Sequence, residues 1–296
     1  MKSLTLIACK EFSDRFRSGW VVACVLVWLG AICLTSIFGL VQIGRIGVQG
    51  YDRTVVSLLS LVQYLVPLLA LLLGHDLIVS EREERTLALL VASGVSRARV
   101  LCAKFAGGVL SLAFPLLLGF IIAGTVIALA TRDREINSFL WLAGSGLVLG
   151  IVFLGIGLAI SVLCRTRVQS LVAALLTWCF AVFAFDLIAL GMLVSLRSPV
   201  AAHEIDVLCD PTHVNTVADL HAAYDAPVGE RDGATVAKRA AALSWILANP
   251  IDLFRAVNLS KQMPTHVPPW VIAGTVGAWL VFALGLSWWR FRRVDL

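Results

Sequence analysis

The sequence predicts an all-α integral membrane protein with six membrane-spanning helices. Of its 296 residues, 59% are hydrophobic and only 15% are charged, whereas soluble domains carry about a quarter charged residues. The mean hydropathy is +0.90, and uncharged runs long enough to cross a bilayer recur along the chain. Because hydrocarbon offers backbone N–H and C=O groups no water to bond, these runs are expected to be helices.

The predicted spans are apolar runs of about 20 residues or more, the length that crosses a bilayer. The fifth run is interrupted by a single charge, Asp186. Charges at this depth usually face a bundle interior and mark function, so we expect either a structural pairing with Arg45 or Arg53 or a role in transport. The six spans are 20–43, 54–77, 105–131, 137–164, 168–196 and 270–289.

The first 19 residues are predicted to form a helix that lies in the membrane interface. Apolar side chains recur at every fourth position, at Ala8, Phe12, Phe16 and Trp20, while charged residues fall on the other side. This spacing is typical of an amphipathic interfacial helix. The alternative is a plain extension of the first span into the cytosol.

The distribution of Lys and Arg predicts that both termini lie on the cytoplasmic side of the membrane, which we expect to be a bacterial inner membrane. The short segments on the side of the termini hold fourteen of these cations, and the opposite short loops hold four. Cations accumulate on the cytoplasmic side of membrane proteins, and long loops are left out of this comparison. The fourteen are Lys2, Lys10, Arg15, Arg17, Arg82, Arg85, Arg97, Arg99, Lys104, Arg165, Arg167, Arg290, Arg292 and Arg293; the four are Arg45, Arg53, Arg132 and Arg134.

The segment between the second and third spans is predicted to be a cytosolic coupling helix over 80–94. Ser80 and Glu83 have the spacing of a capping box, an apolar stripe follows, and Gly94 ends the helix. A helix of this kind can insert into a groove of a partner protein; the alternative is a solvated charged turn. The candidate coupling residues are Glu81, Glu83, Glu84, Arg85, Leu87 and Leu90.

A long extracytoplasmic loop is predicted over 197–268, between the fifth and sixth spans. A loop of this length is expected to fold or dock, and Asn249-Pro250 marks a break before a short helix over 251–257. Cys209, His213 and His221 are candidate metal ligands, because thiolate and imidazole together suit copper or zinc. The alternative is that they are ordinary polar residues of an exposed loop.

Motifs for catalysis and nucleotide binding are missing from the sequence. There is no GxxxxGK[ST], GxSxG or HExxH, so we expect a non-catalytic chain with no ATP site and no cofactor of its own. Gly144, Gly146 and Gly150 lie inside a span with no preceding strand, so they do not indicate a dinucleotide site, and Gly146 and Gly150 predict a close helix-packing face. The net charge of +5 does not indicate nucleic-acid binding, because the cations flank the spans and form no patch.

The coupling segment resembles that of ABC-2 type transporter permeases. The resemblance rests on residues 81–90, Ser96-Arg97 and 101–104, with Arg85 where glycine is frequent and Gly94 where proline is common. Within this family the chain is similar to permeases that serve the maturation of nitrous-oxide reductase, a copper enzyme. The stretches that carry this likeness are 10–15, 65–76, 78–79, 185–187 and 249–260.

The resemblance implies a homodimer bound to two copies of a separate cytosolic ATPase, which would hold ATP and Mg. It also implies a periplasmic copper-handling partner, for which Asn249, Pro250, Asp252 and Arg255 are the candidate docking residues. The permease would relay ATP-driven motion to that partner. Two other hypotheses stay open: an ABC-2 exporter of a lipid, glycan or hydrophobic small molecule, and an unrelated membrane enzyme whose polar residues converge in space.

Overall fold

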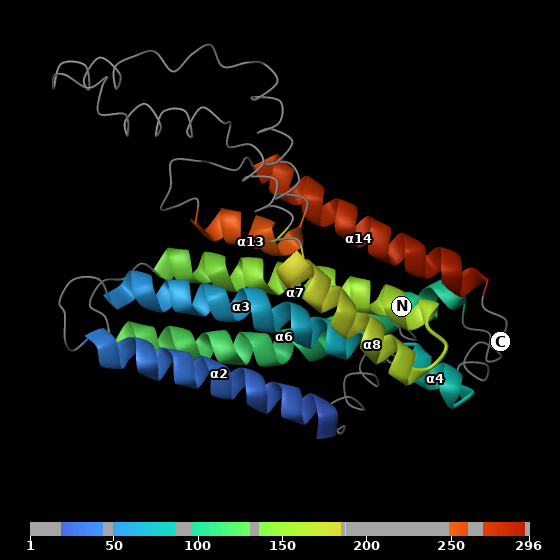
Figure 1. The fold of residues 1–296 in the computed structure, drawn as a ribbon, viewed down its shortest axis with the longest axis horizontal. Helices are drawn as coiled ribbons and strands as arrows, with labels where there is room; N and C mark the ends of the chain where they lie inside the picture. Colours follow the sequence, from blue (N-terminus) through green and yellow to red (C-terminus); the bar gives the residue numbers. More distant parts are fainter. Residues whose placement is uncertain are drawn as a thin grey trace, which may run out of the picture. The chain divides into compact units, whose positions relative to one another are not determined.

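The computed structural model describes residues 19–43, 50–86, 96–130, 136–184, 187, 249–259 and 269–293, and all structural statements below refer to these. They are helical throughout, apart from short turns, which confirms the predicted all-α class (Figure 1). The helices are α2 (Gly19–Ile43), α3 (Gly50–Gly74), α4 (Val79–Glu83), α6 (Arg97–Ala130), α7 (Ile136–Leu163), α8 (Arg167–Cys179), the π-helix η1 (Phe180–Ala184), α13 (Pro250–Leu259) and α14 (Pro269–Arg292).

Four of the predicted spans are confirmed as helices that are long and apolar enough to cross a membrane. They are Ser57–Glu83, Arg97–Thr125, Phe139–Leu163 and Trp270–Arg292. Two further apolar stretches, Val25–Thr35 and Arg167–Phe183, are shorter within the part of the chain that the structure describes. The count of six spans therefore stays a prediction. The interfacial helix predicted over 1–19 lies almost entirely outside the described residues.

Helix α6 begins two turns before the predicted start of the third span. The third span was expected to begin at residue 105, where the uncharged run begins, but α6 already begins at Arg97. The guanidinium of Arg97 donates to the backbone oxygens of Phe291 (3.3 Å) and Arg292 (2.9 Å) at the end of α14. A charged residue can thus continue a helix wherever the fold supplies acceptors for it, and charge-free runs underestimate helix length.

The chain divides into two compact units, 1–182 with 250–296 and 183–249, and the first contains the features analysed below. Within it, α7 is the most enclosed of the candidate spans, with 72% of its apolar window buried, against 11% for α14. Helices α3, α6 and α14 all pack on α7, and α2 packs on α3 and α6 (Figure 1). The buried core accordingly follows α3 and α7.

Helices α3 and α7 approach most closely at two glycines. A Cβ atom added at Gly74 would lie 2.9 Å from the Cα of Gly157, and one at Gly157 would lie 2.9 Å from the Cα of Gly74. Such distances are too short for non-bonded carbon atoms, so only glycine fits on either side. The packing face predicted for Gly146 and Gly150 is confirmed as well, since added Cβ atoms there would lie 3.1 Å from Val62 and 3.0 Å from Leu112.

Replacing Gly157 by alanine should therefore destabilise the fold. The added methyl group must push α7 away from α3, and overpacking of this kind costs about 1–3 kcal/mol. We expect a lower midpoint of thermal unfolding in detergent, followed by the loss of the monodisperse size-exclusion peak. Gly30→Ala on α2 is the matched control, because its Cβ would meet nothing within 4 Å. Equal midpoints for the two variants would contradict the close approach.

Candidate functional site

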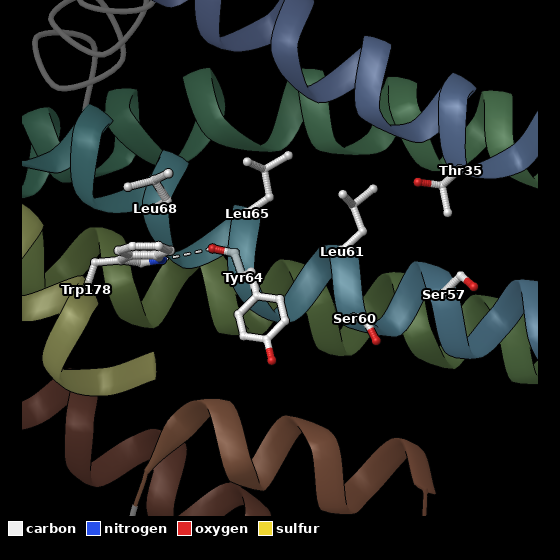
Figure 2. A pocket seen from close by; sticks show the side chains of 8 residues that line it. All are labelled: Thr35, Ser57, Ser60, Leu61, Tyr64, Leu65, Leu68 and Trp178. Atoms are coloured by element: carbon white, nitrogen blue, oxygen red, sulfur yellow. Dashed lines mark hydrogen bonds between the residues drawn. The ribbon is translucent and has the colours of Figure 1, made fainter. Parts of the chain in front are cut away.

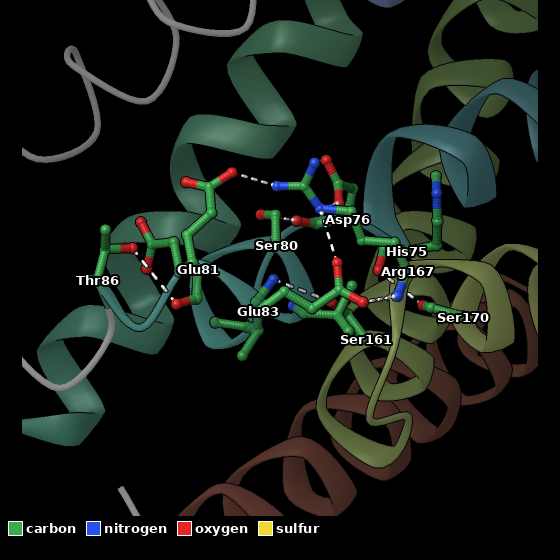
Figure 3. Close-up of polar contacts among 12 residues, drawn as sticks. His75, Asp76, Ser80, Glu81, Glu83, Thr86, Ser161, Arg167 and Ser170 are labelled. Atoms are coloured by element: carbon green, nitrogen blue, oxygen red, sulfur yellow. Dashed lines mark hydrogen bonds and ion pairs between the residues drawn. The ribbon is translucent and has the colours of Figure 1, made fainter.

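The end of α3 carries a cluster of polar contacts that we call the polar joint, comprising residues 75–86 and the side chains of α6, α7 and α8 that bind them (Figure 3). A turn after Gly74 leads into α4. The first N–H groups of any helix lack partners inside that helix. Here the Ser161 hydroxyl of α7 accepts from the N–H groups of Ile78 (2.9 Å) and Val79 (3.0 Å). Helix α4 is thus capped by another helix.

The capping box predicted from Ser80 and Glu83 is wrong. The N-cap of α4 is Ile78, with no side-chain cap of its own, so Ser80 lies inside the helix and not at its N-cap. The Ser80 hydroxyl instead donates to the backbone oxygen of Asp76 at 2.7 Å. The Glu83 carboxylate is used elsewhere, since its Oε1 accepts from the backbone N–H of Arg167 at 2.8 Å.

Arg167, the first residue of α8, lies among three carboxylates of the polar joint (Figure 3). Its Nε is 3.6 Å from Oδ1 of Asp76 and 3.4 Å from Oε2 of Glu83, and its Nη2 pairs with Glu84. The guanidinium is about two-fifths exposed, so solvent screens these pairs and each contributes little stability. Their geometric effect is to attach the start of α8 to α4 and to the turn before it.

The start of α8 is fixed by local contacts as well. The Thr166 hydroxyl accepts from the backbone N–H of Gln169, and the Gln169 side chain accepts from the N–H of Arg165, both at 3.3 Å. The Ser170 hydroxyl then donates to the backbone oxygen of His75 at 2.7 Å. These residues were not among the predicted site residues, although the Thr-x-x-Gln spacing is that of a capping box.

A buried ion pair connects the polar joint to α6. Lys104 Nζ lies 2.8 Å from Oε1 of Glu81, and the two side chains are 2% and 22% exposed. A lysine this buried needs a partner for its charge. Glu81, predicted as a coupling residue, is therefore directed into the protein. The other described coupling candidates, Glu83, Glu84 and Arg85, are exposed.

Arg82 connects α4 to the end of α7, where its Nη1 donates to the backbone oxygen of Cys164 at 2.9 Å. At this position the backbone makes the contact and the cysteine side chain does not.

Helix α4 ends after Glu83, so an uninterrupted coupling helix over 80–94 is wrong. Arg85 has a φ of 58°, in the left-handed region that closes many helix ends, and its N–H donates to the backbone oxygen of Arg82 at 3.2 Å. The family pattern explains this position, since glycine adopts that φ without strain. Leu87 and Leu90 lie outside the described residues.

The remaining predicted site residues are placed in part. Helix α13 begins at Pro250, directly after Asn249, which confirms the helix predicted after that break. Arg255 pairs with Asp252 at 3.2 Å and its Nε donates to Oε1 of Gln63 on α3 at 3.0 Å. Both candidate docking side chains thus make contacts within the protein, and partner binding stays a prediction. The remaining candidates, Asp186, Cys209, His213 and His221, lie outside the described residues.

A groove of about 500 Å³ lies between α2, α3 and α8 (Figure 2). Leucine side chains of α3 line it together with the hydroxyl-bearing Thr35, Ser57, Ser60 and Tyr64. Trp178 of α8 closes one end, where its Nε1 donates to the backbone oxygen of Tyr64 at 2.9 Å. The mixed lining suits either another helix or an amphipathic molecule.

The strain at Arg85 predicts a stabilising substitution. A left-handed φ costs an L-residue about 1–2 kcal/mol, so Arg85→Gly should gain about 0.5 kcal/mol after the entropy that glycine adds to the unfolded chain. Arg99→Gly, an exposed position inside α6, should instead lose about 1 kcal/mol. Thermal unfolding midpoints in detergent measure both variants. A lower midpoint for Arg85→Gly would show that this residue is not strained.

The ion pair between Glu81 and Lys104 predicts a coupled pair of substitutions. Lys104→Met leaves the Glu81 carboxylate without its partner, which should cost about 3 kcal/mol. Adding Glu81→Gln to that variant removes the unpaired charge and should recover most of the loss. A double-mutant cycle of unfolding free energies checks this. Simple additivity of the two substitutions would mean that the pair does not form.

Comparison with known proteins identifies a family and similar proteins. The family described as ABC-2 family transporter protein matches residues 5–296. The probable ABC transporter permease protein NosY of Stutzerimonas stutzeri is 35% identical over 198 residues, which are 66% of this chain and 72% of that protein. Its namesake in Pseudomonas aeruginosa is 34% identical over 220 residues, 72% of this chain and 80% of that protein. The resemblance predicted from the coupling segment is confirmed: the chain belongs to the ABC-2 family and is a multi-pass membrane permease subunit of an ABC transporter.

Proposed function

We propose that this chain couples ATP hydrolysis on a separate cytosolic ATPase subunit to the far side of the membrane, in the copper-site maturation of nitrous-oxide reductase. Similarity to two NosY permeases supports the choice of pathway. ATP and Mg would be held by the ATPase, and the permease itself would be non-catalytic. In this proposal both termini and the polar joint face the cytoplasm, where the excess of Lys and Arg is expected.

The polar joint is the observation that carries the coupling proposal. An ATPase that docks on the exposed carboxylates of Glu83 and Glu84 would act on side chains that already bind Arg167 of α8. Displacement of α4 would also pull on α6 through Lys104 and on the end of α7 through Arg82. One docking event would in this way move three membrane helices together.

The proposal includes two further partners. A second copy of the chain would pack on the groove between α2, α3 and α8 and make a homodimer with two ATPase subunits. A NosD-like copper-handling protein in the periplasm would dock near Asn249, Pro250, Asp252 and Arg255. Copper would bind to that partner, with Cys209, His213 and His221 of this chain as further candidate ligands.

Export of a lipid, glycan or hydrophobic small molecule is a second candidate function. The groove of about 500 Å³ favours it, because it is lined by leucine and hydroxyl side chains and lies beside membrane-spanning helices (Figure 2). In an exporter the grooves of two copies would face a shared path. In the coupling proposal, each groove would be filled by the other copy of the chain.

A charge reversal at Glu84 tests the docking proposal. Glu84→Lys removes an exposed carboxylate and places a second cation beside Arg167, so the ATPase should be lost or left unstimulated. The measurements are co-purification of the ATPase with tagged permease from the native host, identified by mass spectrometry, and the rate of ATP hydrolysis. Because exposed pairs contribute only about 0–1 kcal/mol, the variant permease should still elute as the wild type does.

Arg99→Glu is the matched control, since it changes an exposed charge by the same amount on α6, outside the polar joint. It should retain the ATPase and its stimulation. If Glu84→Lys behaves like this control, the docking site lies elsewhere.

The copper assignment is tested in the same strain, where the Glu84→Lys permease should yield reductase with less copper. Reductase with full copper and an uncoupled permease would favour the exporter.

A further inference from the structure

A second, strongly apolar cavity of about 320 Å³ lies where α7, α13 and α14 meet. These three helices lie side by side (Figure 1). Aliphatic and aromatic side chains make up nearly the whole lining. Ser145 contributes the one hydroxyl among the lining residues, and it is already engaged, donating to the Trp141 oxygen (2.8 Å) and accepting from Asn258 (3.0 Å).

Water is a poor occupant for this cavity. An ordered water needs two to four polar partners, and apolar cavities of this kind stay dry. An empty space of this size would also leave the surrounding side chains without van der Waals contacts on one side. The cavity therefore suits an apolar guest.

The position of the cavity within the candidate spans limits which kind of apolar group can fill it. Gly144, Val148 and Val152 line it from inside the candidate span Phe139–Leu163, and Ile272 and Val276 line it from inside Trp270–Arg292. At 1.5 Å per residue, the stretch from Gly144 to Val152 covers about 12 Å of membrane depth. A loop at this depth would leave its backbone groups unbonded. A cavity of about 320 Å³ that extends over this depth is too narrow for a helix, which is about 10 Å across.

The cavity also opens on an exposed apolar face of α7. Leu140 and Trp141 line it and are 61% and 50% exposed. Apolar side chains exposed at the depth of a span can contact lipid tails. A lipid chain beside α7 thus has an apolar route into the cavity.

We propose that this cavity holds one acyl chain of a membrane phospholipid, seated between α7 and α14 and in contact with α13. The site goes beyond the coupling function, because it lies within one protomer and needs no ATPase. The acyl chain would supply packing for α14, which is the least enclosed of the candidate spans. In this proposal the lipid stays bound as part of the folded protein and is not transported.

Photolabelling of the full-length chain tests the site. The probe is phosphatidylethanolamine with a diazirine in the middle of one acyl chain, mixed into vesicles of phosphatidylethanolamine and phosphatidylglycerol. After illumination, labelled peptides are mapped by mass spectrometry. We expect label on α13 at Leu253 and Val257, which are only 2% and 6% exposed. Lipid that merely surrounds the protein cannot reach them, whereas a chain inside the cavity does.

A cavity-filling variant provides the comparison. A Cβ at Gly144 would meet nothing within 4 Å, so the side chain in Gly144→Leu has room to enter the cavity and should abolish the α13 label. Gly30→Leu on α2, where a Cβ is equally free, should keep it. Val148→Phe, from the same wall, repeats the comparison in case Gly144→Leu fails to fold.

Two outcomes overturn the proposal. The first is the absence of label on α13 in the wild-type chain, which would mean that another part of this chain or a second copy fills the cavity. The second is label that persists in a folded Gly144→Leu or Val148→Phe chain at the level of Gly30→Leu. The proposal is supported if the α13 label is lost in Gly144→Leu and Val148→Phe but kept in Gly30→Leu. Neither result depends on the ATPase, so the coupling proposal stands or falls separately.

Discussion

The close approach of α3 and α7 at Gly74 and Gly157 is the constraint on which the polar joint depends. Ser161 lies four residues after Gly157, on the same face of α7. Because the two backbones touch, the Ser161 hydroxyl reaches the first N–H groups of α4 as α3 ends. A side chain at either glycine would move α3 outward and take these donors away from Ser161. The position of α4, and of the carboxylates it carries, follows from this contact.

The contacts that hold α4 differ in how firmly they bind. The pair of Glu81 and Lys104 is largely enclosed, and separating a buried pair leaves a charge that water does not stabilise. The contacts of Arg167 with Glu83 and Glu84 are partly exposed, so water and salt screen them and their exchange costs little. Helix α4 is therefore anchored to α6 more firmly than to α8. A force on the exposed face of α4 would break the contacts of Glu83 and Glu84 with Arg167 of α8 before the pair of Glu81 and Lys104.

The sequence predicted much of the fold, because apolar runs of spanning length leave few alternatives in a membrane. The charges of residues 81–85 also pointed to the segment that forms the polar joint. The sequence did not identify their partners, since Lys104 and Arg167 are distant in sequence and only tertiary packing brings them to Glu81 and Glu84. The Ser80 motif failed where the fold offered a competitor: Ser161 of α7 accepts from the N–H groups of Ile78 and Val79, so α4 begins before Ser80 and Ser80 lies inside the helix. No such competitor displaced the cap by Thr166.

The shortness of α4 has a consequence for how any partner would act on it. The helix runs from Val79 to Glu83 and is closed by the left-handed Arg85. A single helical turn is unstable by itself, because too few hydrogen bonds offset the cost of nucleation. Its structure must therefore come from its contacts with α6, α7 and α8, through Lys104, Ser161 and Arg167. Any change in the conformation of this turn therefore also changes its contacts with α6, α7 and α8.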